Sequence, residues 1–255
     1  MLHAISRKKS RRHKAYHYNH CEKVRAEGER RVSEEDEITS IIFGPLSLLR
    51  AEDSYEFWKA CLCRDEKCKN KGPEDSPVSV SVEFWPKLKG VEPDLFFEYK
   101  FNNDRYLNIL VELKWRSPLS GENQLKKQWE EFLTDDDRKN TIHVLIGPDI
   151  SVGISAMEAT TVDHQEKLFL WSWPWLCNHV LSELSKDTNI TDGLRNWSGL
   201  IKSFIEAVGI KQFVGFGGLK IETSDTDIQL FRFRFNWHSP VVKGRKLKLF
   251  TIEGV

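Results

Sequence analysis

The sequence has no run of apolar residues approaching the roughly 20 that a membrane-spanning helix needs. It has no apolar signal segment, and its five cysteines, an odd number, do not suit a disulfide framework. Internal repeats and long low-complexity tracts are also missing. We therefore expect a soluble protein of the reducing cytoplasm that does not contact a membrane.

Several motifs that carry chemistry are missing as well. Cys61, Cys63 and Cys68 lack the spacing of a zinc ribbon, which favours free thiols. The glycine-rich residues 215–218 are not followed by the helix and the Lys-Ser/Thr pair of a phosphate-binding loop, and nothing resembles the nucleophile elbow of a hydrolase. His143 lies in an apolar segment, so we expect a hydrogen-bonded core histidine there instead of a catalyst.

The formal net charge is zero, but the charges are segregated. Residues 1–32 hold ten Lys or Arg against three Glu, a local charge of +7, interleaved with His and Tyr. Such an arm can follow a phosphate backbone and stack its rings on bases, or it can be a solvated tail that binds a partner. Arg232 and Arg234, which alternate with phenylalanines, offer a second basic face.

Hydrophobic periodicity predicts an α/β protein. Residues 78–84 alternate apolar and polar side chains, and residues 92–99 and 109–115 form an expected β-hairpin around the polar turn 102–104. Ser33, with acidic residues after it, predicts the start of a first helix. Further along we expect a helix over about 121–133, strands at 141–148 and 167–171, and helices at 173–184 and 194–208.

The predicted hairpin carries Asp94, Glu112 and Lys114 into the core. Because side chains alternate along a strand, Glu112 and Lys114 share one face. Charges inside a sheet are costly unless they are paired or bind an ion. Two carboxylates beside an ammonium favour Mg²⁺ or Mn²⁺, with Lys114 acting on a water or on a phosphate; the alternative is a salt-bridged sheet edge.

Pro93-Asp94 followed by Glu112-Leu113-Lys114 resembles the PD-(D/E)xK signature of the restriction-endonuclease-like nuclease superfamily. The helix after the hairpin carries Gln124 and Gln128 on one face, and in many members of the superfamily a Gln on this helix supports the site. The expected element order also matches the αβββαβ core of that superfamily. The resemblance implies a mixed sheet flanked by helices in residues 33–150, after the basic arm 1–32, with a C-terminal α/β extension, residues 151–255, packed on that core.

The stretch Glu35–Leu46 resembles the opening of a bacterial group of this superfamily that is often found in phage-defence loci. Its members carry an acidic-x-x-Thr-Ser-x-x-Phe-Gly pattern. In the wider superfamily a Glu on this first helix approaches the metal. Glu35 is the best match for that role, and Glu37 is the alternative because a shift along the helix would exchange the two.

The resemblance implies a divalent-metal-dependent DNA endonuclease that acts in anti-phage defence with a protein partner from the same locus, and as a homodimer if it cuts both strands. Two alternatives stay open: a catalytically silent nucleic-acid-binding module and an assembly subunit of a larger defence complex. The implied roles are metal binding by Asp94, Glu112 and the carbonyl of Leu113, action of Lys114 on the attacking water, assistance by Glu35, and orientation of water or phosphate by Gln124 or Gln128.

Overall fold

The computed structural model describes residues 35–65, 67, 73–115, 119 and 123–210. Three predicted features lie outside the described residues: the basic arm, Ser33 as a helix cap, and the segment with Arg232 and Arg234. Cys68 and the glycine-rich stretch 215–218 also lie outside them. In the described part of the chain, no helix combines the length and the apolar character that crossing a bilayer requires.

The described residues form an α/β fold around one five-stranded mixed sheet, as the sequence predicts. The first three strands run antiparallel to their neighbours, whereas the third, fourth and fifth are parallel. The strands lie side by side in chain order: β1 (Ser79–Phe84), β2 (Leu95–Lys100), β3 (Tyr106–Leu113), β4 (Thr141–Gly147) and β5 (Leu168–Ser172).

The predicted hairpin is confirmed as β2 and β3. Asn103 and Asp104 in its turn both have a left-handed backbone, with φ of 64° and 54°. Asn and Asp tolerate this conformation better than most residues, which explains the tight reversal. Phe96 pairs with Leu110 in the resulting register, so the even-numbered residues of both strands point to one face of the sheet.

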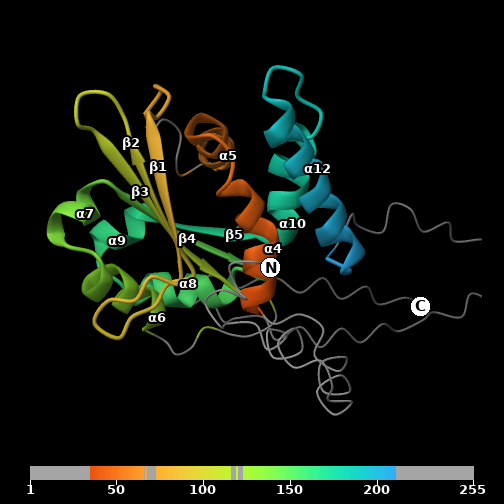
Figure 1. The fold of residues 1–255 in the computed structure, drawn as a ribbon. Coiled ribbons are helices and arrows are strands. Elements are labelled where there is room, and N and C mark those ends of the chain that lie inside the picture. Colours follow the sequence, from red (N-terminus) through yellow and green to blue (C-terminus); the bar gives the residue numbers. More distant parts are fainter. Residues whose placement is uncertain (1–34, 66, 68–72, 116–118, 120–122, 211–255) are drawn as a thin grey trace, which may run out of the picture. The chain divides into compact units, whose positions relative to one another are not determined.

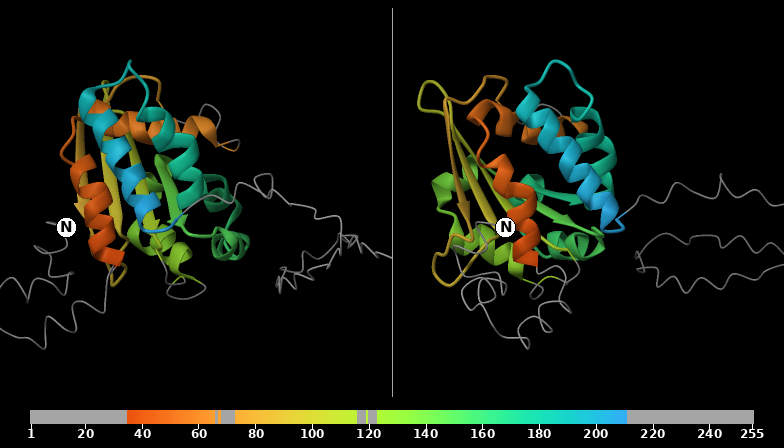
Figure 2. Two further views of the ribbon diagram at one scale, coloured as in Figure 1. Left: turned by 90° about the vertical axis from the view of Figure 1, so that its right-hand side faces the viewer. Right: turned by 45° about the vertical axis from the view of Figure 1, so that its right-hand side comes forward.

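One face of the sheet is covered by two helices from the first part of the chain and a helical group from the last. Figure 1 shows these helices together on one side of the sheet, and in the left view of Figure 2 they lie in front of it. Trp58 is fully buried between this layer and the sheet, with its ring 5.3 Å from that of Phe97. The elements are α4 (Glu35–Leu46), α5 (Ala51–Arg64), the run α10 (Trp173–Trp175), η3 (Leu176–Leu181, a π-helix) and α11 (Ser182–Leu184), and α12 (Asp192–Ala207).

The other face is covered by shorter helices. Leu110, Trp129 and Leu133 form one small apolar cluster there, and Leu125 packs with Leu145 in a second. The helix predicted over 121–133 is α-helical only in its first turn and continues as a π-helix. The elements are α6 (Gln124–Lys127), η2 (Gln128–Phe132, the π-helix), α7 (Asp135–Lys139), α8 (Ser151–Glu158) and α9 (Val162–Lys167), of which the last three are not predicted from the sequence.

Residues after 150 contribute to the same sheet and core. They supply β5, which pairs with β4, and they supply α12, which packs on the first helices. Trp197 of α12 donates its indole N–H to the carbonyl of Ile42 at 2.8 Å and meets the ring of Phe57 at 4.9 Å. Trp171 and Trp173 are buried in this core.

Candidate functional site

Asp94 stands at the point where β2 and β3 separate. The last paired residues of the two strands are Leu95 and Val111, so the backbone N–H of Leu113 has no strand partner on that side. The carboxylate of Asp94 accepts this N–H instead, with an Oδ2–N distance of 2.7 Å. Because the N–H and C=O of a strand residue point toward the same neighbour, the carbonyl of Leu113 also lies on the Asp94 side.

Glu112 and Lys114 lie on the same face of β3, as the alternation predicts. The ammonium of Lys114 is 2.7 Å from Oε1 of Glu112, and the Glu112 side chain is only 2% exposed. The backbone of Lys114 is held on the other side: its N–H donates to Ile146 and its carbonyl accepts the indole N–H of Trp173, both at 2.8 Å. A carboxylate and an ammonium are therefore fixed together at the end of a central strand.

Gln124 and Gln128 both point at Glu112. The Nε2 of Gln124 donates to Oε1 of Glu112, and the Nε2 of Gln128 donates to Oε2, each at 2.6 Å. Gln128 is the first residue of the π-helix η2, and wider turns of this kind occur often at functional sites. The two glutamines thus hold the carboxylate itself, whereas the sequence suggests that they orient water or phosphate.

The acidic residues of the site share an unfavourable environment. Burial raises the pKa of Asp94 well above its ordinary value, and the nearby charge of Glu112 raises it further. Burial also raises the pKa of Glu112, although the Lys114 ammonium and the two glutamine amides oppose that change. The two carboxylates therefore repel each other, and a bound cation would relieve that repulsion.

Lys114 keeps its positive charge at neutral pH. Burial alone would lower its pKa, but Glu112, Asp94 and Glu35 together outweigh burial and raise it above the ordinary lysine value. A general base at neutral pH would need a lowered pKa. The geometry therefore favours Lys114 as an ammonium that stabilises negative charge over Lys114 as a group that deprotonates water.

The acids of the first helix lie near the same strand end. Glu35 accepts the backbone N–H of Trp115 at 2.7 Å, which brings it to the residue after Lys114. Glu37, the alternative from the sequence, is buried with 3% exposure. Asp36 lies close enough to raise the pKa of Asp94, and sequence analysis did not single it out. The signal was available in the sequence, because Asp36 is the acidic residue three positions before Thr39 in the acidic-x-x-Thr-Ser pattern.

Asp94 and Glu112 fit a magnesium ion that keeps much of its water. Among the residues that the structure describes, no three His, Cys, Asp or Glu side chains are grouped so that they could hold a metal. Mg²⁺, however, is commonly bound by only one or two carboxylates together with waters and substrate phosphate. The buried carboxylate of Glu112 and the half-buried carboxylate of Asp94, with a backbone carbonyl on the same side, provide that donor set.

Behind Gln128 lies a group of aromatic side chains that the sequence did not connect with the site. His143 is fully buried and hydrogen-bonded, as predicted for a core histidine, but its partners are Gln128 at 3.1 Å and His164 at 2.9 Å. Trp129 stacks on His164, with 4.6 Å between ring centroids. His164 belongs to α9, a helix absent from the predicted order, which is why sequence reasoning missed it.

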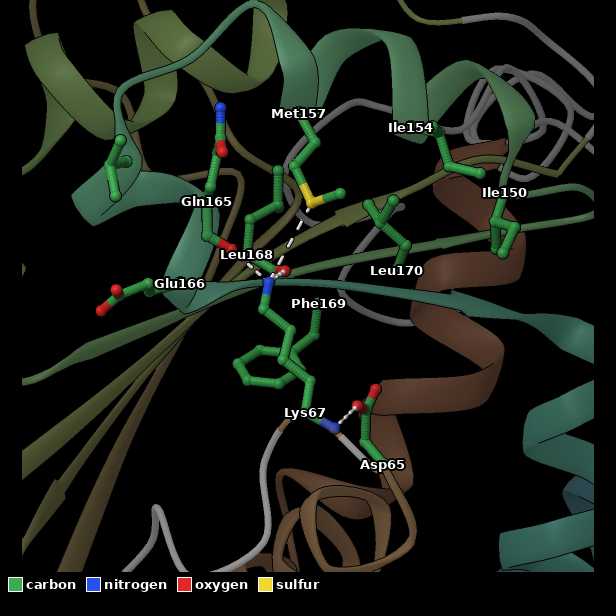
Figure 3. Close-up of a pocket in the computed structure, with 11 residues that line it drawn as sticks. Asp65, Lys67, Ile150, Ile154, Met157, Gln165, Glu166, Leu168, Phe169 and Leu170 are labelled. Carbon is green, nitrogen blue, oxygen red and sulfur yellow. Dashed lines mark hydrogen bonds between the residues drawn. The ribbon is translucent and has the colours of Figure 1, made fainter. Parts of the chain in front are cut away.

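A separate cavity of about 490 Å³ opens beside β5, lined mostly by apolar side chains of α8, α9 and β5 (Figure 3). The ammonium of Lys67 lies in it and donates to the carbonyl of Leu168 at 2.7 Å. None of the residues proposed for chemistry lines this cavity. It is distinct from the carboxylate site at the end of β3.

Comparisons with models of protein families, with curated proteins and with solved structures found no match to this chain. A function for the carboxylate site therefore has to rest on its own residues and geometry.

Proposed function

We propose that this protein is a divalent-metal-dependent DNA endonuclease with a restriction-endonuclease-like core. One observation carries the proposal: Asp94, Glu112 and Lys114 meet at the end of β3, where the buried carboxylate of Glu112 and the half-buried carboxylate of Asp94 adjoin a retained ammonium. Such a group is costly for folding alone, since buried charges without full compensation are destabilising. Binding of a divalent cation and a phosphodiester is the chemistry that uses this charge pattern.

The order of the elements supports the same proposal. With α5 and the short α7 as additions, a helix, three antiparallel strands, a helix and a parallel strand occur in that order as α4, β1 to β3, α6 with η2, and β4. This order agrees with the αβββαβ core that the signature motif implies. Asp94 and Glu112 then occupy the ends of the second and third strands, as that resemblance requires.

Asp94, Glu112 and the carbonyl of Leu113 would hold Mg²⁺ or Mn²⁺. When bound, the ion would acidify a water and neutralise charge on the phosphate. Lys114 keeps its ammonium beside the reacting phosphate and stabilises the negative charge that develops during attack. Gln124 and Gln128 keep both oxygens of Glu112 in one orientation, and Glu35 fixes the chain after Lys114 through Trp115.

The proposal has three further parts, which follow from the resemblance of the sequence motifs. The substrate is DNA, the setting is phage defence, and a protein from the same locus is the partner. A single carboxylate site cuts one strand at a time. Cleavage of both strands therefore calls for a homodimer or for two successive events.

The test is cleavage of supercoiled plasmid by the full chain with Mg²⁺, with Mn²⁺ and with EDTA. We expect metal-dependent nicking by the wild type and its loss in Asp94→Ala and in Lys114→Ala. Lys186→Ala is the matched control, because Lys186 is an exposed lysine after α11, on the other layer of the fold. It should cleave like the wild type.

Cleavage that persists in Asp94→Ala would refute the proposed site. Salt-dependent DNA binding with no cleavage by the wild type under any metal would instead favour a catalytically silent binding module, since such binding needs only the electrostatic contacts.

A further inference from the structure

The metal-binding carboxylate of Glu112 is the first member of a buried chain of hydrogen bonds. Gln128 donates to Glu112 with its amide nitrogen, and its amide oxygen is 3.1 Å from Nε2 of His143. Nδ1 of His143 is in turn 2.9 Å from Nε2 of His164. All three side chains behind Glu112 are at most 1% exposed, so water does not enter the chain from the described surface.

The direction of this chain follows from its first bond. An ionised carboxylate only accepts hydrogen bonds, so Gln128 must turn its NH₂ group toward Glu112 and its oxygen toward His143. That oxygen accepts, so His143 must carry its proton on Nε2, which leaves Nδ1 as an acceptor. His164 must then donate from its own Nε2.

The far end of the chain agrees with this direction. Nδ1 of His164 is buried and has no hydrogen-bond partner in the described structure. The derived direction leaves this nitrogen without a proton, whereas the opposite direction would bury an unpaired N–H and face the Gln128 oxygen against a carboxylate. Two acceptors 2.6 Å apart would repel each other, which excludes the opposite direction while Glu112 is ionised.

Both histidines are held neutral, so each ring carries a single proton, as the assignment of donors and acceptors requires. Burial lowers the pKa of His143 well below its ordinary value, and His164 lowers it further. Burial, with a contribution from Lys67, lowers the pKa of His164 to about 3. The stacked indole of Trp129 and the N-terminal turn of α9, capped by Thr161, fix the plane and position of the His164 ring.

We propose that His143 and His164 are positioning residues of the Glu112 site: through Gln128 they hold the Glu112 carboxylate in the one orientation in which it binds the metal. The proposal rests on the metal-dependent function proposed above, and it extends that function to residues two and three hydrogen bonds away. Neither histidine touches the substrate. Apolar side chains could fill the same space between β4, η2 and α9, but they could not select one orientation of the Gln128 amide.

The first experiment measures the ring protonation of both histidines by ¹⁵N NMR in the full-length, metal-free chain. In the wild type both rings should carry their proton on Nε2. In Glu112→Gln the new amide must keep its oxygen toward Lys114 and Gln124, which both donate to that position. Its NH₂ group then faces Gln128, so Gln128 must turn round and both histidines should move their proton to Nδ1.

This reversal is independent of cleavage, and so it separates the two proposals. A wild type with Nδ1–H on His143, or unchanged histidine tautomers in Glu112→Gln, would refute the proposed series of hydrogen bonds even if the protein proves to be a nuclease. The expected tautomers together with an inactive wild type would support the series of hydrogen bonds and reject the nuclease.

The second experiment measures Mn²⁺ binding by electron paramagnetic resonance, without DNA, in His143→Phe and His164→Phe. His164→Phe keeps a ring that can stack on Trp129, so this variant still tests the proposal if His143→Phe fails to fold. Loss of groups that orient a metal ligand commonly weakens metal binding about 10–100-fold, and we expect a loss in that range. The metal needed for half-maximal cleavage should rise equally, with less change at saturating metal.

His179→Phe is the matched control, because His179 lies in η3 with its ring tilted against that of Trp175, away from Glu112. It should bind Mn²⁺ like the wild type. Wild-type Mn²⁺ affinity in a folded His164→Phe chain would overturn the positioning role.

Discussion

The two faces of the sheet are covered by different kinds of side chain. The face toward α4, α5 and α12 is an aromatic and aliphatic core around Trp58 and Phe97, and nearly every side chain in it is fully buried. The face toward η2 and α9 buries Glu112, Gln128, His143 and His164 among small apolar clusters. Strand β3 supplies both faces by alternation. One face therefore stabilises the fold, while the other gives up some stability to fix a charged group.

The largest expected effect is in the apolar layer. Trp58 is fully buried and contacts the rings of Phe43, Phe57 and Phe97. Trp58→Ala should lower the free energy of unfolding by about 3–5 kcal/mol, measured by urea denaturation, because it leaves a large cavity. Leu200→Ala is the control: Leu200 is 71% exposed, and the change should stay within about 0.5 kcal/mol. A loss below about 1 kcal/mol for Trp58→Ala would contradict the contrast between the faces.

In the polar layer, removing a pair of buried charged side chains should not lower the free energy of unfolding, unlike removal of a buried side chain from the apolar layer. Lys114→Met leaves Glu112 buried without its cation and should cost about 3 kcal/mol at neutral pH. Adding Glu112→Leu removes the buried carboxylate that has lost its cation, so the double variant should regain that loss or exceed the wild type. Chemical denaturation of the two single variants and the double variant measures the coupling. If the double variant is less stable than Lys114→Met, the charges contribute to stability and the contrast is wrong.

The two buried histidines of the polar layer should make the free energy of unfolding depend on pH. Their pKa values are lowered in the folded protein, to about 3 for His164, against about 6.5 when unfolded. Below about pH 6.5 the unfolded chain binds more protons than the folded one, so stability is complete above that pH and falls as the pH falls. Each histidine contributes a limiting slope of about 1.4 kcal/mol per pH unit.

Denaturation of the wild type and His164→Phe between about pH 7.5 and pH 5.5 checks this slope. The variant should lose less stability on acidification, by about 1.4 kcal/mol over the range. Parallel curves for the two proteins would show that His164 takes up its proton in the folded state.

The smallest effect concerns α7, at the margin of the polar layer. Thr134 caps this helix by accepting the backbone N–H of Asp137, whose side chain accepts the N–H of Thr134 in return. Thr134→Ala should cost about 1 kcal/mol of unfolding free energy in a denaturant titration. Thr188→Ala, at an exposed threonine outside the helices, should change it by less than about 0.5 kcal/mol. Equal effects of the two changes would show that the cap adds nothing.

Sequence patterns predicted most of the long elements and missed several short ones. The β2–β3 hairpin was predictable because alternation and turn residues such as Asn103 are local signals. The π-helix η2 was not, since its sequence reads as an ordinary amphipathic helix, and α7 to α9 are too short to show a clear period. The restriction-endonuclease-like assignment stays a prediction.

The candidate site divides in the same way. Asp94, Glu112, Lys114, Gln124 and Gln128 were predictable as a group, because strand alternation and helical spacing bring them to one face. His164 was not, because it reaches the group through a helix whose rotation and docking depend on packing. The role of Lys114 as a retained cation also needed the structure, since its pKa depends on which carboxylates surround it.

The sequence alone determined the α/β class, the hairpin and the face of β3 that carries the charges, because period and turn chemistry are properties of neighbouring residues. The tertiary structure alone decided what lies behind those charges. It turned Gln124 and Gln128 onto Glu112 instead of toward solvent, and it placed His143 and His164 in line behind Gln128. Hydrogen bonds between residues far apart in the chain form only when packing brings their atoms within about 3 Å.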